Sequence, residues 1–290
     1  MSDFVITGKT RVCGVIGDPI EHTMSPVLHN NAYRELGLDY IYTAFRVKPE
    51  ELEQAVQGMR GLGITGLNVT IPHKVNIIPF LDELGPLAER IGAVNTITNT
   101  NGYLKGYNTD ATGFLRALKD KNVDPKGKEV LVLGAGGASR AISFILAESG
   151  ASLTILNRRE ELDWAEGLAK QISEVFHRKI KAMEMTEANL ETIIKRSDIL
   201  VNTTSVGMLP KADVTPVPAR LLTSEKIVFD IVYNPVKTRL RTEAEAAGCQ
   251  TIGGLDMLVW QGALAFEMWT GKMPPADIMK KEAVKVLEGK

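Results

Sequence analysis

From its start to about residue 250, the chain alternates between short apolar runs typical of strands and stretches with the longer apolar period of helices. In the first hundred residues, short apolar runs rich in β-branched side chains predict strands at 11–17, 40–47, 64–70 and 93–98. Prolines near Ser25, Glu50 and His73 indicate helix starts between these runs, because a missing amide donor is tolerated in a first helical turn. Asn101-Gly102 predicts a hairpin turn. The pattern favours an α/β sheet.

A second alternating series begins after Thr109. It predicts helices at 111–119, 138–148 and 160–176, and strands at 129–133, 152–156, 180–183, 199–202 and 227–231. This order is typical of a doubly wound, Rossmann-type nucleotide-binding domain. After Gly253-Gly254 the pattern changes to two helices, 256–270 and 276–287, which we expect to return to the first domain. We therefore expect an N-terminal α/β domain at 1–109, a Rossmann domain at 110–253 and C-terminal helices at 254–290.

Composition narrows the possible functions. The 290 residues are 44% hydrophobic and 24% charged, which is typical of a compact globular protein, and the net charge of −1 offers no basic surface for nucleic acid. The first four residues show no signal pattern, and no apolar run is long enough to span a membrane. Two cysteines are too few for a disulfide framework. We expect a cytoplasmic protein, a monomer or homodimer, without a metal site.

A glycine turn follows the apolar strand 130–133 and leads directly into a helix. Strand, turn and helix in this order let the backbone approach a pyrophosphate and direct free amides toward it. An ordinary tight turn is the alternative, and the third glycine slot holds Ser139. The predicted cofactor contacts are Gly134, Ala135, Gly136, Gly137 and Ala138.

The next strand ends at Asn157-Arg158-Arg159, where NAD-binding folds usually have an acid for the ribose hydroxyl. Two guanidinium groups at this position instead suit a 2′-phosphate, so the sequence predicts NADP as the cofactor. One of the two arginines is expected simply to face solvent. The polar loop that contains Thr203 and Ser205 follows another buried strand and is expected at the same sheet edge, with a simple Ser/Thr-rich turn as the alternative.

Small hydroxyls, amides and one lysine gather near strand ends in the first domain, a mixture suited to a polyhydroxylated acid. Several of these motifs closely resemble the shikimate dehydrogenase family. The matching stretches are Asn-Val-Thr-x-Pro-x-Lys at 68–74, Gly-Ala-x-Asn-Thr at 92–96, Gly-x-Asn-Thr-Asp-x-x-Gly at 106–113, and the segments 230–235 and 254–261. The resemblance covers nearly the whole chain.

The resemblance implies reversible, NADPH-dependent reduction of 3-dehydroshikimate to shikimate in aromatic amino-acid biosynthesis. By family role Lys74 and Asp110 form the catalytic pair, while Gly254 and Met257 border the cofactor. The implied substrate contacts are Thr23, Ser25, Asn68, Thr70, Asn95, Tyr233 and Gln261.

One position departs from the family pattern, because Thr23 stands where a serine is usual. The extra methyl narrows the end of the pocket where shikimate and quinate differ, so a quinate/shikimate dehydrogenase using NAD or NADP stays an alternative. A non-catalytic NADPH-binding metabolite sensor is a second alternative, and a glutamyl-tRNA reductase is a weaker one because neither Cys13 nor Cys249 lies in an activating context.

The two residues of the expected catalytic pair suit the chemistry that the resemblance implies. Hydride transfer to a ketone leaves a developing alkoxide that requires a proton donor, and an ammonium next to a carboxylate supplies one. Taken singly, Lys74 also fits an exposed lysine at a helix start, and Asp110 fits a helix N-cap. Their occurrence together with the polar clusters favours catalysis.

Overall fold

The computed structural model describes residues 5–289, so the four N-terminal residues used above in the argument about a signal segment lie outside it. The described chain forms two compact units. The first unit consists of Met1–Gly113 together with Val259–Lys290, and the second of Phe114–Leu258. Two helices, α5 (Thr109–Asp120) and α10 (Gly254–Thr270), contain the points at which the chain passes between the units.

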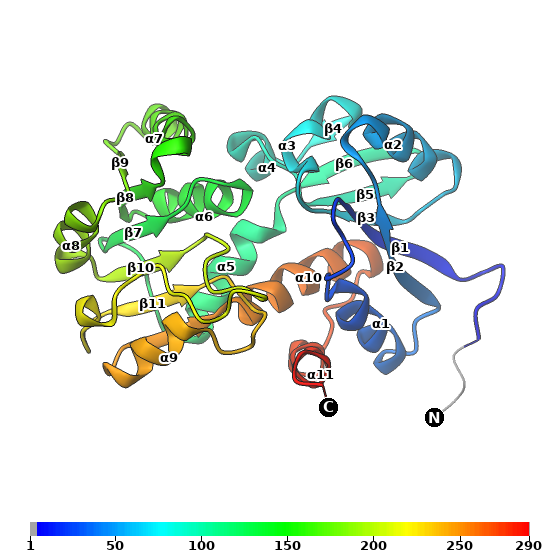
Figure 1. Cartoon of the computed structure of the whole chain (residues 1–290). Helices are drawn as coiled ribbons and strands as arrows, with labels where there is room; N and C mark the ends of the chain where they lie inside the picture. Colours follow the sequence, from blue (N-terminus) through cyan, green and yellow to red (C-terminus); the bar gives the residue numbers. More distant parts are fainter. Residues whose placement is uncertain (1–4, 290) are drawn as a thin grey trace. The chain divides into compact units, whose positions relative to one another are not determined.

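The first unit contains a mixed sheet of six strands in the order β2-β1-β3-β5-β6-β4 within the described residues (Figure 1). Strand β1 pairs in parallel with β2 and β3, whereas β5 runs antiparallel to both β3 and β6. The strands are β1 (Arg11–Gly17), β2 (Tyr40–Arg46), β3 (Gly66–Val69), β4 (Glu83–Leu84), β5 (Thr96–Thr100) and β6 (Tyr103–Tyr107).

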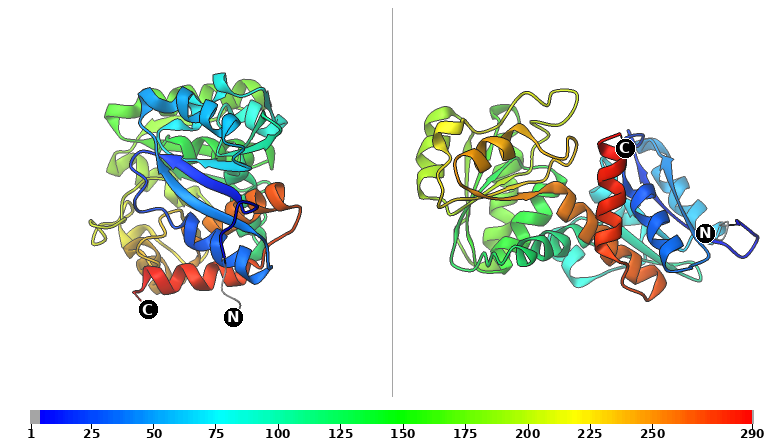
Figure 2. Two further views of the ribbon diagram at one scale, coloured as in Figure 1. Left: turned by 90° about the vertical axis from the view of Figure 1, so that its right-hand side faces the viewer. Right: turned by 90° about the horizontal axis from the view of Figure 1, so that it is seen from below.

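Helices cover both faces of this sheet. One face packs against α2 and α4 in an apolar core that includes Val56, Leu67 and Ile97. On the other face α1 packs against α11, a helix from the far end of the chain (Figure 2). The helices are α1 (Ser25–Glu35), α2 (Leu52–Gly61), α3 (His73–Asn76), α4 (Pro86–Ile91) and α11 (Ala276–Leu287), with short 3-10 turns η1 (Pro49–Glu51) and η2 (Ile78–Phe80).

The second unit contains six parallel strands in the order β12-β11-β10-β7-β8-β9 among the residues described. The strand order reverses between β7 and β10, which creates the switch point where doubly wound sheets bind nucleotides. The strands are β7 (Glu129–Leu133), β8 (Ser152–Asn157), β9 (Lys181–Glu184), β10 (Ile199–Asn202), β11 (Ile227–Asp230) and β12 (Gln250–Gly253).

Helices also cover both faces of the parallel sheet. Val228 on β11 joins the core beneath α8 and α9, whereas the next residue, Phe229, meets the Phe114 ring of α5 at 4.6 Å between ring centroids. Successive strand residues point to opposite faces, so these contacts identify a sheet buried on both sides. The helices are α6 (Gly137–Glu148), α7 (Leu162–Phe176), α8 (Glu187–Arg196) and α9 (Arg239–Ala246), with turns η3 (Arg159–Glu161) and η4 (Ala219–Leu221).

Candidate active site

The two residues predicted to form the catalytic pair lie in contact. The Lys74 ammonium donates a hydrogen bond to the Asp110 carboxylate, with 2.7 Å between Nζ and Oδ2. Their side chains are only 15% and 9% exposed, so the pair is largely shielded from solvent. A charged pair at this distance in a partly buried setting interacts far more strongly than one at the surface.

Asp110 lies within the first turn of α5 and does not cap it. Asn108 performs that role, because its side-chain oxygen accepts a hydrogen bond from the amide of Ala111. Asn95 fixes the same turn, since its side-chain oxygen accepts from the backbone amide of Thr109 at 2.6 Å. The Asp110 carboxylate is thus free of any capping role and available to Lys74.

Lys74 lies on α3, a helix of one turn. The carbonyl oxygen of Lys74 accepts a hydrogen bond from the Val94 amide at 2.7 Å, and the His73 ring contacts the Val47 carbonyl at 2.7 Å. These contacts dock the short helix onto the chain leading into β5 and onto the end of β2. They hold the lysine in place despite the shortness of its helix.

A buried hydrogen-bond network connects two predicted substrate residues, Asn68 and Asn95. The Tyr42 hydroxyl donates to Asn68 Oδ1 at 2.7 Å, while the Asn68 amide donates to the Asn95 carbonyl and the Thr96 hydroxyl. Both amide hydrogens of Asn68 are therefore committed within the protein, and only its oxygen keeps a free lone pair for a substrate hydroxyl. Sequence reasoning missed Tyr42, which has the pattern of an ordinary core residue of a strand.

The remaining predicted residues of the first unit lie at the start of α1, after β3 and on α10. Thr23 and Ser25 share a hydrogen bond of 3.3 Å between their hydroxyls at the start of α1. Thr70 follows β3, and its methyl group lies so close to Gly17 that a Cβ there would be 2.4 Å away. Gln261 is buried on α10, whose backbone approaches α5 closely enough that only glycine fits at position 113.

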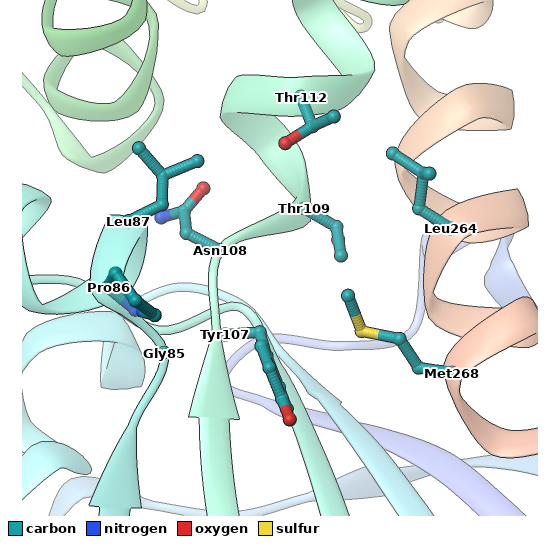
Figure 3. Close-up of a pocket in the computed structure, with 10 residues that line it drawn as sticks. Gly85, Pro86, Leu87, Tyr107, Asn108, Thr109, Thr112, Leu264 and Met268 are labelled. Atoms are coloured by element: carbon teal, nitrogen blue, oxygen red, sulfur yellow. The ribbon is translucent and has the colours of Figure 1, made fainter.

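A small pocket of about 160 Å³ lies beside the first turn of α5 (Figure 3). Thr112 and Asn108 line it, one helical turn apart on the same face, whereas Asp110 lies about halfway around the helix. Leu87 of α4 lines it near Asn108, and Leu264 and Met268 of α10 line it on the other side. This pocket is therefore separate from the Lys74–Asp110 pair.

The second unit places the glycine turn at the switch point of its sheet. Gly134 follows β7 with a φ of +97°, a conformation that L side chains rarely adopt. The Thr203 hydroxyl, at the end of β10, donates to the Leu133 carbonyl at 2.5 Å. The predicted turn and the Thr203 loop thus come together, as expected from the parallel sheet, and Ser205 lies exposed on the same loop.

The turn leads into α6 without side chains that would block a ligand. A Cβ on Gly136 would meet nothing within 4 Å, and Ala135, Gly137 and Ala138 are partly exposed. Ser139, in the third glycine slot, is buried and donates to the Gly134 carbonyl at 2.7 Å. These residues fit a pyrophosphate, because α6 is a full helix of 12 residues whose first amides need partners.

The residues after β8 are arranged around a turn. Asn157 is buried and donates to the Glu161 carbonyl at 2.7 Å, which closes the turn. The Arg158 side chain is 63% exposed and paired with the Glu161 carboxylate, which raises the pKa of the arginine further. Arg159 is exposed. A phosphate approaching Arg158 would compete with Glu161 for its guanidinium.

The other predicted cofactor and substrate residues of the second unit lie near the start of α10. Gly254 opens this helix against the loop after β11, where a Cβ would lie 2.0 Å from the Ile231 carbonyl. Met257 is buried on the same helix. Tyr233 is half-buried in that loop, and loss of hydration raises the pKa of its hydroxyl.

Other reactive groups are not arranged for catalysis or metal binding. Burial raises the pKa of the Cys13 thiol to about 12 and also raises that of Cys249, so neither thiol is an activated nucleophile. No cluster of three or more potential metal ligands occurs in residues 5–289. Among those same residues, we find no helix with the length and apolar character that crossing a bilayer requires.

Comparison with known proteins assigns the whole chain to one group. Residues 15–97 match the shikimate dehydrogenase substrate binding domain, 117–244 the shikimate / quinate 5-dehydrogenase family, and 254–283 the shikimate 5′-dehydrogenase C-terminal domain. The chain belongs to the shikimate dehydrogenase family. The resemblance found in the sequence motifs is thereby confirmed, as is the predicted fold class.

Individual members of the shikimate dehydrogenase family align over nearly their full length. The NADP⁺-dependent shikimate dehydrogenase of Methanopyrus kandleri is 47% identical over 284 residues, which is 97% of this chain and 98% of the relative. A crystal structure of a shikimate dehydrogenase in complex with NADP⁺ superposes with a TM-score of 0.92 at 42% identity, covering 98% of both chains. The enzyme from Listeria monocytogenes, solved with shikimate and NAD, gives a TM-score of 0.89 at 44% identity, covering 95% of this chain and 97% of the other.

Proposed function

We propose that this protein is an NADP-dependent shikimate dehydrogenase, which reversibly reduces 3-dehydroshikimate to shikimate in aromatic amino-acid biosynthesis. The observation that carries the proposal is the shielded contact of 2.7 Å between Lys74 and Asp110. Relatives named for this reaction align with the chain over nearly their full length. Cofactor, reaction and pathway agree with those of the curated relatives.

Lys74 is the proton donor in the direction of reduction. When NADPH is bound it supplies the hydride that adds to the ketone carbon. The ketone oxygen gains negative charge as the hydride adds, and the Lys74 ammonium transfers a proton to it to give the alcohol. Asp110 keeps the ammonium oriented through the 2.7 Å contact. In the direction of oxidation the Lys74 ammonium must first lose a proton, and the neutral amine then accepts the proton of the substrate hydroxyl.

The polar network of the first unit binds the substrate. The Thr23 and Ser25 hydroxyls are donors for its carboxylate, while Asn68 accepts from a ring hydroxyl through its free lone pair. Thr70, Asn95, Tyr233 and Gln261 complete the proposed contacts. Asn95 also fixes the turn that carries Asp110, so its replacement should affect both substrate binding and catalysis.

The second unit binds NADP. The turn Gly134–Ala138 and the first amides of α6 would hold the pyrophosphate, and Arg158 and Arg159, next to Asn157, would provide positive charge for the 2′-phosphate. Thr203, Ser205, Gly254 and Met257 would contact the nicotinamide half of the cofactor. This assignment rests on the switch point between β7 and β10 and on the absence of an acidic residue at the end of β8.

An assay of shikimate and quinate, each with NADP and with NAD, tests the proposal directly. We expect kcat/KM to be highest for shikimate with NADP, measured as absorbance of the reduced cofactor. Turnover of quinate at a comparable rate would identify the alternative, a quinate/shikimate dehydrogenase, and would point to the Thr23 end of the pocket. Binding of NADPH and shikimate without any turnover would identify a metabolite sensor and reject the proposal.

A further inference from the structure

Asp230 is a fully buried carboxylate that the proposed chemistry does not use. It ends β11 at the carboxyl edge of the parallel sheet and is 0% exposed. Its Oδ1 accepts hydrogen bonds from the Asn202 side chain at 2.9 Å and from the Val232 amide at 3.2 Å. Its Oδ2 accepts from the Thr238 hydroxyl at 2.6 Å. One carboxylate thus holds three donors.

The three donors belong to three different segments. Asn202 is the last residue of β10 and directly precedes Thr203, while Val232 directly precedes Tyr233. Thr238 is the N-cap of α9. Two backbone bonds join the same segments, from Ile231 to the Asn202 carbonyl at 3.1 Å and from Leu209 to the Asn234 carbonyl at 3.0 Å. Asp230 therefore lies where these loops meet.

The site retains an ionisable group that packing alone would not require. Burial raises the pKa of Asp230, and the three hydrogen bonds and the nearby Arg241 guanidinium oppose that rise. Buried ionic groups often add nothing to stability compared with apolar side chains of similar volume. An ionised carboxylate, however, can accept from three donors at once and so fixes their relative positions.

We propose that Asp230 is a positioning residue for cofactor binding, which fixes the loops carrying Thr203 and Tyr233 at the nicotinamide side of the second unit. The inference rests on the proposed function, which assigns Thr203 to NADP and Tyr233 to the substrate. Asp230 itself does not contact the cofactor. It acts through Asn202, the Val232 amide and Thr238.

The experiment compares Asp230→Ala and Asp230→Asn with the wild-type enzyme in full-length form. NADPH affinity is measured from the fluorescence of the bound cofactor, and KM is measured separately for NADP and for shikimate. We expect Asp230→Ala to raise the Kd for NADPH about tenfold or more, since it removes three hydrogen bonds. Asp230→Asn should restore part of the affinity because its one oxygen still accepts. The KM for shikimate should rise as well, because the loop that Asp230 holds also carries Tyr233, a proposed substrate contact.

Val228→Ala is the control for a purely structural effect. Val228 is buried on the same strand and faces the core beneath α8 and α9, so its truncation should lower thermal stability without moving the loops. Equal increases in Kd for Val228→Ala and Asp230→Ala would overturn the inference. If Asp230→Ala fails to fold, Thr238→Val removes one donor and should raise the Kd about twofold to fivefold, whereas Thr238→Ser should not. An unchanged Kd in Thr238→Val would then overturn it.

The wild-type enzyme separates this inference from the function on which it rests. A wild-type protein that neither binds NADPH nor oxidises shikimate would reject the proposed function. A wild-type protein that does both, with Asp230 variants that bind NADPH normally, would reject only the role of Asp230.

Discussion

Lys74 depends on its neighbours for its position, because an isolated helical turn has almost no stability of its own. The Val94 amide and the Val47 carbonyl hold the turn, and Asp110 holds the ammonium. At the scale of residues, sequence motifs were sufficient to single out Lys74 and Asp110. They did not indicate which backbone groups would hold the turn that carries Lys74. Tyr42 lies 26 positions from Asn68 in sequence, and nothing in a strand pattern indicates that its hydroxyl will reach across β1 to a residue of β3.

Replacement of Lys74 by alanine should remove the proton donor. We expect kcat to fall by about 10²–10⁴-fold, the usual contribution of a positioned acid-base group. The matched control is Lys105→Ala, which removes another lysine of the same unit paired with a carboxylate, Glu83, at 2.6 Å. Steady-state kinetics of shikimate oxidation measure both, and similar rates in the two variants would reject the catalytic role of Lys74.

Replacement of Arg158 by alanine should weaken NADP binding specifically. The expected rise in KM for NADP is about 10–100-fold, the range for a charge-assisted hydrogen bond, while the KM for NAD should change little because NAD lacks the 2′-phosphate. Arg220→Ala is the control, an exposed arginine of the same unit that also pairs with glutamates. An equal change for both cofactors would contradict the assignment of Arg158.

Some helices and strands can be predicted from the local sequence pattern, and others cannot. Strands such as β7 and β10 lie at their predicted positions, because a short continuous apolar run between polar turns is typical of a strand buried on both faces. The two-residue β4 and the polar helix α9 were missed, since one is too short for any period and the other has only Leu240 and Ala244 buried. Their positions depend on neighbouring elements and not on local sequence.

The contact between β3 and α10 depends on a glycine. A Cβ on Gly66 would lie 2.0 Å from the Trp269 indole nitrogen, which donates to the Ile97 carbonyl at 3.0 Å. Gly66→Ala should therefore destabilise the protein by about 1–3 kcal/mol, as overpacking of a rigid core does. Gly58→Ala on α2, where a Cβ meets nothing, should be neutral or stabilising. Urea unfolding measures both, and equal stabilities would contradict the packing argument.

The whole first unit should become less stable in mild acid because of His29. Its ring is fully buried, stacks on Tyr42 at 4.2 Å, and has a pKa lowered by burial from 6.5 to about 3. Between these two values the unfolded chain binds a proton that the folded chain does not, so the free energy of unfolding falls as pH falls below 6.5. The contribution is fully present above pH 6.5.

A variant isolates this contribution from the other titrating groups. Relative to His29→Phe, the wild-type protein should lose about 2 kcal/mol of unfolding free energy between pH 7 and pH 5, at about 1.4 kcal/mol per unit of pKa shift. Urea unfolding at both pH values measures the difference. His22→Phe, at an exposed position, is the control. Parallel pH curves for His29→Phe and the wild-type protein would contradict the prediction.

The division of the chain into units has a consequence for its synthesis on the ribosome. The second unit is one continuous segment, whereas the first needs Val259–Lys290, which include Trp269 and the helix that packs against α1. A nascent chain halted shortly after Leu258 has emerged should therefore contain a protease-resistant second unit but a sensitive first unit. The strands β1, β2 and β3 must wait until residues 259–290 have been made, and during that interval the α1 face of their sheet is available to a chaperone.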